Sequence, residues 1–201
     1  MKVLGIDPGS RKVGYALLEM QKGEITHINS GVLNVANENS FLIRIKVIHQ
    51  FFKTFVANNN PDEIAIESLI YVKDPTALIK LAQARGAIIS AFVSEYENKI
   101  FEYTPNTIKM FTTGYGHAKK ISIERYLNIK LGAIKYFSHD QSDACAVSLC
   151  HLSHVINGEK RDEKIKESEV MNSSFFGGNS GSRRSKSSIA DSLKHLNLSV
   201  K

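Results

Sequence analysis

Four carboxylates stand at positions where their chemistry could be combined. Asp7 ends an apolar run and precedes Pro-Gly, and Glu67 follows three apolar residues. Asp140 and Asp143 lie three apart at the start of a helical pattern, so they share a helix face. Convergent carboxylates repel one another unless a cation lies among them, and hard oxygen ligands favour magnesium or manganese over zinc. Such ions activate water and stabilise the leaving oxygen when a phosphodiester is hydrolysed.

Each acid taken alone has a simpler explanation. Asp7 could be a turn residue, because Asp-Pro-Gly is good turn chemistry, Asp140 could be a helix N-cap, and Asp143 could be an ordinary first-turn acid. Glu67 decides the matter, since an acid ending an apolar central strand is costly unless it has a task. The four together predict a metal site. The opening strand, acid and glycine turn also resemble the phosphate cradle of sugar kinases and related ATPases, but this chain is too short for their two half-domains.

The elements that must position these acids can be read from the hydrophobic periodicity. Alternation and turn residues predict strands, and steps of three and four predict helices. The expected strands are 2–7, 12–20, 24–35, 63–68 and 100–103, and the expected helices are 39–58, 75–97, one opening at 104–105, 118–129 and 140–157. Three strands in series followed by alternating strands and helices predict an α/β fold with a mixed five-stranded sheet flanked by helices. That order is the order of the ribonuclease-H-like fold, in which the first and fourth strands are neighbours, so Asp7 and Glu67 should meet.

Composition narrows the class of protein and its partners. The 201 residues carry a net charge of +6 with a pI of about 9.2, which favours a polyanionic partner, although much of the excess could belong to the C-terminal segment. No apolar run approaches the roughly 20 residues of a membrane span, so a cytoplasmic protein without a membrane partner is expected. Cys145 and Cys150 lie five apart on a predicted helix and point apart, so we expect no disulfide. The spacing of the nearby histidines matches no usual zinc motif.

Several motifs follow one another along the chain. They are Gly5-Ile6-Asp7-Pro8-Gly9-Ser10-Arg11 with Gly14-Tyr15, Ala65-Ile66-Glu67, Leu81-Ala82-Gln83-Ala84-Arg85-Gly86-Ala87, Tyr103-Thr104-Pro105 with Lys109, and Asp140-Gln141-Ser142-Asp143-Ala144. In this order they resemble the RuvC family of Holliday junction resolvases. The resemblance covers residues 1–157, which we interpret as a nuclease domain. Residues 158–201 are charged and Ser-rich, lack the apolar surface for a core, and are predicted to form a flexible basic tail.

The resemblance implies a magnesium-dependent endonuclease, with manganese as a substitute, that cuts four-way DNA junctions in recombination and repair. It implies Asp7, Glu67, Asp140 and Asp143 as metal ligands, Lys109 and Lys120 as DNA contacts, and Ile70 or Tyr71 as the side chain that probes the junction centre. It also implies the RuvA–RuvB branch-migration complex as a partner.

A junction with two-fold symmetry needs two cuts, so a homodimer is expected. Its predicted interface is the helix at 75–97, which has apolar residues on more than one side, although a helix buried within the monomer would explain that pattern too. Two other functions remain open on the sequence: a related nuclease acting on RNA or an RNA–DNA hybrid, and a junction-binding module without catalysis.

Overall fold

The computed structural model describes residues 1–69, 74–114, 120–156 and 158, and only the backbone of Thr113 and Lys120. All of these residues belong to the first of two units, 1–166 and 167–201. Apart from Gly158, the predicted tail at 158–201 lies outside the described residues, as do Ile70 and Tyr71.

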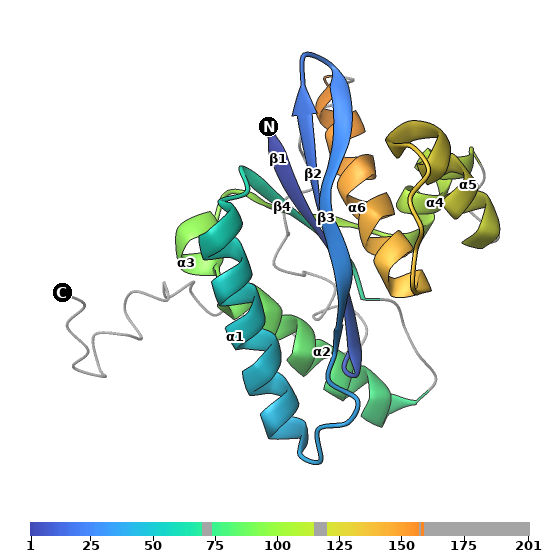
Figure 1. The fold of residues 1–201 in the computed structure, drawn as a ribbon. Coiled ribbons are helices and arrows are strands. Elements are labelled where there is room, and N and C mark those ends of the chain that lie inside the picture. Colours follow the sequence, from blue (N-terminus) through green and yellow to red (C-terminus); the bar gives the residue numbers. More distant parts are fainter. Residues whose placement is uncertain (70–73, 115–119, 157, 159–201) are drawn as a thin grey trace, which may run out of the picture. The chain divides into compact units, whose positions relative to one another are not determined.

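A mixed sheet of five strands forms the centre of the described part (Figure 1). The strands are β1 (Lys2–Asp7), β2 (Lys12–Gln21), β3 (Glu24–Asn34), β4 (Glu63–Glu67) and β5 (Ile100–Tyr103), in the spatial order β3-β2-β1-β4-β5. The first three strands form an antiparallel meander, whereas β4 runs parallel to β1 and β5 runs parallel to β4. The α/β class and the mixed five-stranded sheet predicted from the periodicity are confirmed.

Six helices of the described residues connect and cover the strands. They are α1 (Phe41–Asn59), α2 (Pro75–Ser90), α3 (Val93–Tyr96), α4 (Pro105–Thr113), α5 (Lys120–Leu131) and α6 (His139–Ile156). Two of these helices are capped by side chains: the Asp74 side chain accepts the Thr76 N–H, and the Thr104 hydroxyl accepts the Thr107 N–H. The prediction of one continuous helix over 75–97 is wrong. The backbone leaves the helical region at Phe92, with φ of −145°, and the Phe92 ring enters the core.

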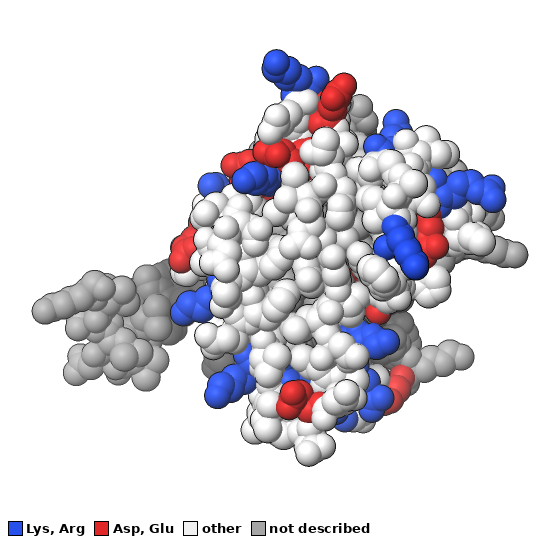
Figure 2. Space-filling model, viewed as in Figure 1, with Lys and Arg blue, Asp and Glu red and all other residues white. Residues whose placement is uncertain are grey.

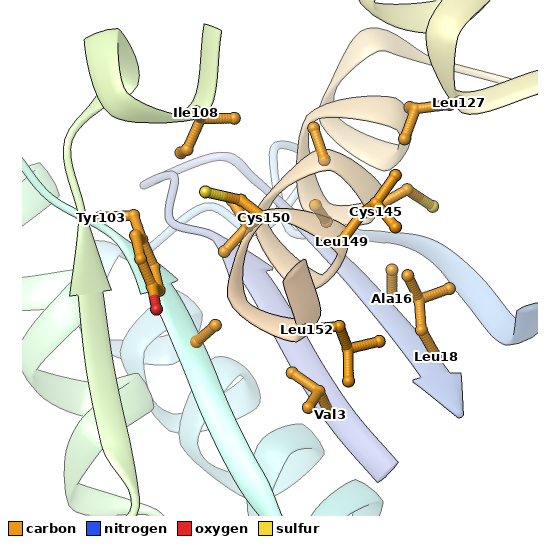
Figure 3. Packing of buried hydrophobic residues seen from close by; sticks show 14 of the residues in the cluster. Val3, Ala16, Leu18, Tyr103, Ile108, Leu127, Cys145, Leu149, Cys150 and Leu152 are labelled. Atoms are coloured by element: carbon orange, nitrogen blue, oxygen red, sulfur yellow. The ribbon is translucent and has the colours of Figure 1, made fainter. Parts of the chain in front are cut away.

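The sheet separates two hydrophobic cores, because successive residues of a strand face opposite sides. Figure 1 shows α1 and α2 on one face of the sheet and α6 on the other, with α4 and α5 beside α6. The core on the α6 side is shown in Figure 3, where Val3, Ala16 and Leu18 of the sheet surround Leu149 and Leu152 of α6. Both cysteines, Cys145 and Cys150, are free and buried in this core. Within the described residues, no helix has both the length and the apolar character needed to cross a membrane.

A polar network lies inside the same core, toward the C-terminal end of α6. The His151 side chain is 1% exposed, and its Nε2 lies 2.7 Å from Glu63 Oε2 at the start of β4. Its Nδ1 lies 2.8 Å from the hydroxyl of Tyr103 at the end of β5. One neutral tautomer satisfies both contacts, with Nε2–H donating to the carboxylate and Nδ1 accepting the hydroxyl proton. The network therefore ties α6 to both β4 and β5 at a fixed height along the helix.

Replacing His151 by Ala should lower the free energy of unfolding by about 3–5 kcal/mol, because it removes the buried partner of a carboxylate and leaves a cavity. The measurement is urea unfolding followed by circular dichroism. His139→Ala is the control, because its side chain is 65% exposed and its ion pair with Glu124 is a surface one. That change should cost less than about 1 kcal/mol. Equal small effects of both substitutions would contradict a structural role for the buried network.

Candidate metal-binding active site

Two of the predicted acids end neighbouring strands. Asp7 is the last residue of β1 and Glu67 is the last residue of β4, and the parallel register pairs Ile6 with Ile66 immediately before them. Strand alternation places Asp7 on the face of Val3 and Gly5, and Glu67 on the face of Ala65, which is the face covered by α6. The two carboxyl groups therefore lie side by side beneath this helix, as the sequence predicts.

Close packing of α6 on the sheet brings the other two acids to the same place. A Cβ on Gly14 of β2, which pairs with Asp7, would overlap the carbonyl oxygen of Asp140. A Cβ on Gly5 of β1 would overlap the side chain of Ser148. The Ser148 hydroxyl also donates to the Ala16 carbonyl at 2.9 Å. Glycine at these two strand positions is what allows the first turns of α6 to lie directly over the ends of β1 and β2.

The first turn of α6 is capped by a residue that is not one of the acids. The Gln141 N–H donates to the Ser138 hydroxyl at 3.3 Å, which makes Ser138 the N-cap of the helix. Asp140 is thus inside the first turn, and the alternative that its carboxylate serves as the cap is not what the structure contains. The charges of Asp140 and Asp143 both act on Asp7, and both acids lie at the helix end where the dipole favours negative charge.

The electrostatics of Asp7 reflect the whole cluster. Burial, the charge of Glu67, a hydrogen bond to Glu67, and the charges of Asp143 and Asp140 together raise the pKa of Asp7 to about 9. The Asp7–Glu67 pair therefore holds a proton more tightly than an isolated carboxyl group does, and this proton lies in the hydrogen bond between the two side chains. A protonated carboxyl beside three other acids indicates a place where negative charge is in excess and a cation would be stabilised.

The four carboxyl groups are near one another, but their arrangement is not that of a complete metal-coordination site. Among residues 1–69, 74–114, 120–156 and 158, no three His, Cys, Asp or Glu side chains are arranged closely enough to hold a metal ion. The Asp7 and Glu67 carboxyl groups are instead joined by a hydrogen bond that shares a proton. The donor set itself, four carboxylates and no sulfur, fits a hard divalent cation that would displace this proton.

A second polar cluster borders the acids and was not predicted from the sequence. Glu124 of α5 accepts a hydrogen bond from the Ser142 hydroxyl at 3.3 Å, and its Oε1 lies 3.1 Å from Nδ1 of His139. Ser142 and His139 flank Asp140, so this contact fixes the start of α6 against α5. The spacing of Glu124 carries no signal of this role, because only tertiary packing brings the two helices together.

The remaining predicted site residues are placed less completely. Lys109 lies on α4, half-buried, and Lys120 is the first residue of α5, with its side chain outside the described atoms. Ile70 and Tyr71 follow β4 and lie outside the described residues.

A hollow lined by residues of the β2–β3 hairpin, α4, α5 and α6 lies away from the acids. It includes Gly23, Phe111 and Ile156, and therefore opens near the C-terminal end of α6, not at its first turn.

Comparison with known proteins gives a consistent family. The family model described as crossover junction endodeoxyribonuclease RuvC matches residues 3–151. The chain is 33% identical over 156 residues to the protein of that name from Geobacter sulfurreducens, covering 78% of this chain and 94% of the relative. It is 37% identical over 152 residues to the one from Halothermothrix orenii, covering 75% and 92%.

Solved structures agree on the fold. A structure described as T. thermophilus RuvC in complex with Holliday junction substrate superposes with a TM-score of 0.72 at 23% identity, covering 79% of this chain and 96% of that chain. A second, described as Thermus thermophilus RuvC structure, gives a TM-score of 0.69 at 24% identity, covering 79% and 97%. With the family model matched across most of the described residues and relatives above 30% identity over nearly their whole length, the chain belongs to the RuvC family of crossover junction endodeoxyribonucleases.

Proposed function

We propose that this protein is a structure-selective endonuclease that resolves four-way DNA junctions by hydrolysing one phosphodiester per subunit. The observation that carries the proposal is the cluster of four acids at the ends of β1 and β4 and the first turns of α6, in a chain of this family. The products are a 5′-phosphate and a 3′-hydroxyl. The reaction belongs to recombination and DNA repair in the cytoplasm, with the RuvA–RuvB complex as partner.

Asp7, Glu67, Asp140 and Asp143 are the residues that hold the divalent cation, magnesium or in its place manganese. Support comes from the donor set and from the raised pKa of Asp7, which is caused first by burial and then by the negative charge of Glu67. When bound, the cation supplies positive charge that offsets this repulsion and stabilises the charge developing on the reacting phosphate. The carboxylates would hold the cation at the edge of the sheet, and Asp7 would release its proton when the cation binds.

DNA contacts are assigned to residues around the cluster. Lys109 and Lys120 bind backbone phosphates near the cut, and Ile70 or Tyr71 enters the open centre of the junction. The support is the resemblance together with their places in the chain, directly after β4 and on the helices that follow β5. Figure 2 shows one face, over β3 and α1, whose middle is largely uncharged, with Lys and Arg interspersed with Asp and Glu toward its borders. Binding through phosphates makes affinity fall steeply with salt.

A homodimer supplies the two cuts, and the exposed side of α2 is its proposed interface. One side of α2 is buried, because Ala84, Ala87 and Ile88 pack in the monomer core. The opposite side of the helix is exposed. Ala84 and Ile88 are therefore removed from the interface that the sequence suggested. Ile79 is 58% exposed, and the exposed Ala82 follows it on the same side of the helix. A small-residue surface with one large apolar side chain suits helix packing across a two-fold axis.

The protein should cut a synthetic four-way junction in magnesium and leave a linear duplex and an RNA–DNA hybrid intact. Asp7→Asn, which keeps the size and removes the charge, should lower the junction cleavage rate by more than about 100-fold while binding in calcium is retained, since the phosphate contacts lie elsewhere. Gel analysis of labelled substrates measures both. Asp62→Asn is the matched control, because its carboxylate is exposed and accepts the Lys2 N–H at 2.6 Å, a bond that an amide oxygen can also accept. Preferential cutting of the hybrid would replace the proposed substrate class, and normal cutting by Asp7→Asn would remove the proposed site.

Stability without metal should depend on pH through Asp7. Its pKa is raised from 3.8 to about 9 in the folded state, so the folded protein binds this proton more tightly than the unfolded chain. The resulting stabilisation is fully present below about pH 3.8 and is lost as pH rises toward about 9. In EDTA, the stability of Asp7→Asn relative to the wild type should therefore increase by at least about 1 kcal/mol as the pH rises through this window. One pKa unit corresponds to about 1.4 kcal/mol.

Thermal and urea unfolding at several pH values measure this difference. Magnesium should raise the melting temperature of the wild type more than that of Asp7→Asn, because only the complete cluster gains a ligand. A difference between the two proteins that does not change with pH would contradict the raised pKa.

Sedimentation of the full chain at micromolar concentration should give a mass near twice 22.4 kDa. Ile79→Glu should shift it toward the monomer, because a charge would be buried in the interface. The control Leu42→Glu places the same charge at a position that is 77% exposed on α1, and should remain dimeric. A wild type that stays monomeric, or a dimer unaffected by Ile79→Glu, would refute the dimer or its interface respectively.

A further inference from the structure

Phe137 is an aromatic side chain that the core does not bury. Its side chain is 84% exposed, more than any other large hydrophobic side chain of the described residues. It lies in the loop between α5 and α6, which runs to the N-terminal end of α6 (Figure 1), and it precedes Asp140 by three residues. The neighbouring Tyr136 instead packs against the core on the α6 side. Within this loop the Tyr136 ring is therefore turned toward the core, whereas the Phe137 ring is turned toward solvent.

The backbone that carries Phe137 is held in place. Its N–H donates to Oε1 of Gln141 at 2.9 Å, and Gln141 is 5% exposed. Gln141 Nε2 in turn donates to the hydroxyl of Ser30 on β3 at 2.8 Å, which connects the loop to the sheet. Ser138, the next residue, caps α6. The aromatic ring is therefore presented to solvent from an anchored backbone, which lowers the entropy cost of a contact made by it.

A cation accompanies the ring. Lys135 Nζ lies 5.9 Å from the centroid of the Phe137 ring, within the range of a cation–π contact, and Lys135 is itself exposed. An exposed aromatic face with an ammonium group beside it is the combination that binds a nucleotide, because the ring stacks on the base and the ammonium neutralises the phosphate.

The distance to the acids limits which nucleotide this can be. Three residues span at most about 11 Å of extended chain, so the Phe137 backbone lies within about 11 Å of that of Asp140. One strand of DNA advances about 3.4 Å per nucleotide along the helix axis. The ring can therefore reach bases up to roughly three or four nucleotides from a phosphate held at the acids.

We propose that Phe137 is a stacking site for one base of the cleaved strand, within about four nucleotides of the scissile phosphate, and that Lys135 binds a phosphate adjacent to that base. This inference rests on the proposed function, because it needs DNA bound at the acid cluster. It adds a contact that selects unstacked DNA: a base within a continuous duplex has both faces covered, whereas a base next to a junction can leave the stack.

The test places the fluorescent base 2-aminopurine at single positions along a synthetic four-way junction and binds the full-length protein in calcium. The wild type should change the fluorescence strongly at one position within four nucleotides of the mapped cut. Phe137→Ala and Phe137→Leu should lose that change, and Phe137→Tyr should keep it, because Tyr can stack and Leu cannot. Phe137→Ala should also weaken junction binding or single-turnover cleavage by roughly 5- to 100-fold, the range of one base–aromatic stack. Lys135→Ala should lower the salt dependence of binding without removing the fluorescence change.

Leu42→Ala is the control, because it removes another highly exposed apolar side chain, on α1, and should alter neither signal. A wild type that cuts the junction while Phe137→Ala shows the same fluorescence and rate would overturn the stacking site alone. Full rescue by Phe137→Leu would also overturn it, since the contact would then be apolar without stacking. Conversion of Phe137→Ala to a monomer would assign the ring to a subunit contact instead. A wild type that does not cut junctions would overturn the proposed function, which distinguishes the two failures.

Discussion

The close approach of α6 to the sheet is the constraint on which the rest of the described structure depends. Glycine stands at positions 5 and 14 of two strands, and because Gly5 and Gly14 have no Cβ, the helix backbone can lie directly on β1 and β2. Without that approach Asp140 and Asp143 would lie a side chain's thickness further from Asp7 and Glu67. Protein interiors are packed as densely as organic crystals, so a displacement of this size cannot be absorbed by small adjustments elsewhere. The position of one helix thus sets the geometry of the candidate site.

This approach concentrates negative charge, which opposes folding. The raised pKa of Asp7 is the measure of that opposition, with burial as its largest cause and the neighbouring carboxylates as the next. The apolar cores on the two sides of the sheet supply the stabilisation that offsets it. Such repulsion is expected at a cation site. A site whose carboxylates did not repel one another without the cation would gain less when the cation binds.

Much of the fold could be predicted because its signals are local. The apolar runs of β1 and β4 and the helical period of α1 depend on neighbours in the sequence, and each element lies close to its expected bounds. The adjacency of Asp7 and Glu67 also followed, because strand order and a period of two leave no other face for them. The break before α3 could not be predicted, because the Phe92 side chain leaves the helix to fill the core. The spacing of apolar residues along the sequence does not reveal the shape of that core. The links from His151 to Glu63 and from Gln141 to Ser30 span 88 and 111 residues, so no spacing argument could find them.

These long-range links share a logic that the acids alone would not reveal. Different parts of α6 carry different tasks: Asp140 and Asp143 in its first turns contribute charge, Ala144 and Ser148 meet the glycines of the sheet, and His151 fixes the height of the helix against β4 and β5. A helix is rigid along its axis, so a contact near its C-terminal end restrains the carboxylates at its start, about 16 Å away at 1.5 Å per residue from 140 to 151. Because the carboxyl groups repel one another, contacts elsewhere on α6 must hold them in place, and the buried His151 is one of these contacts.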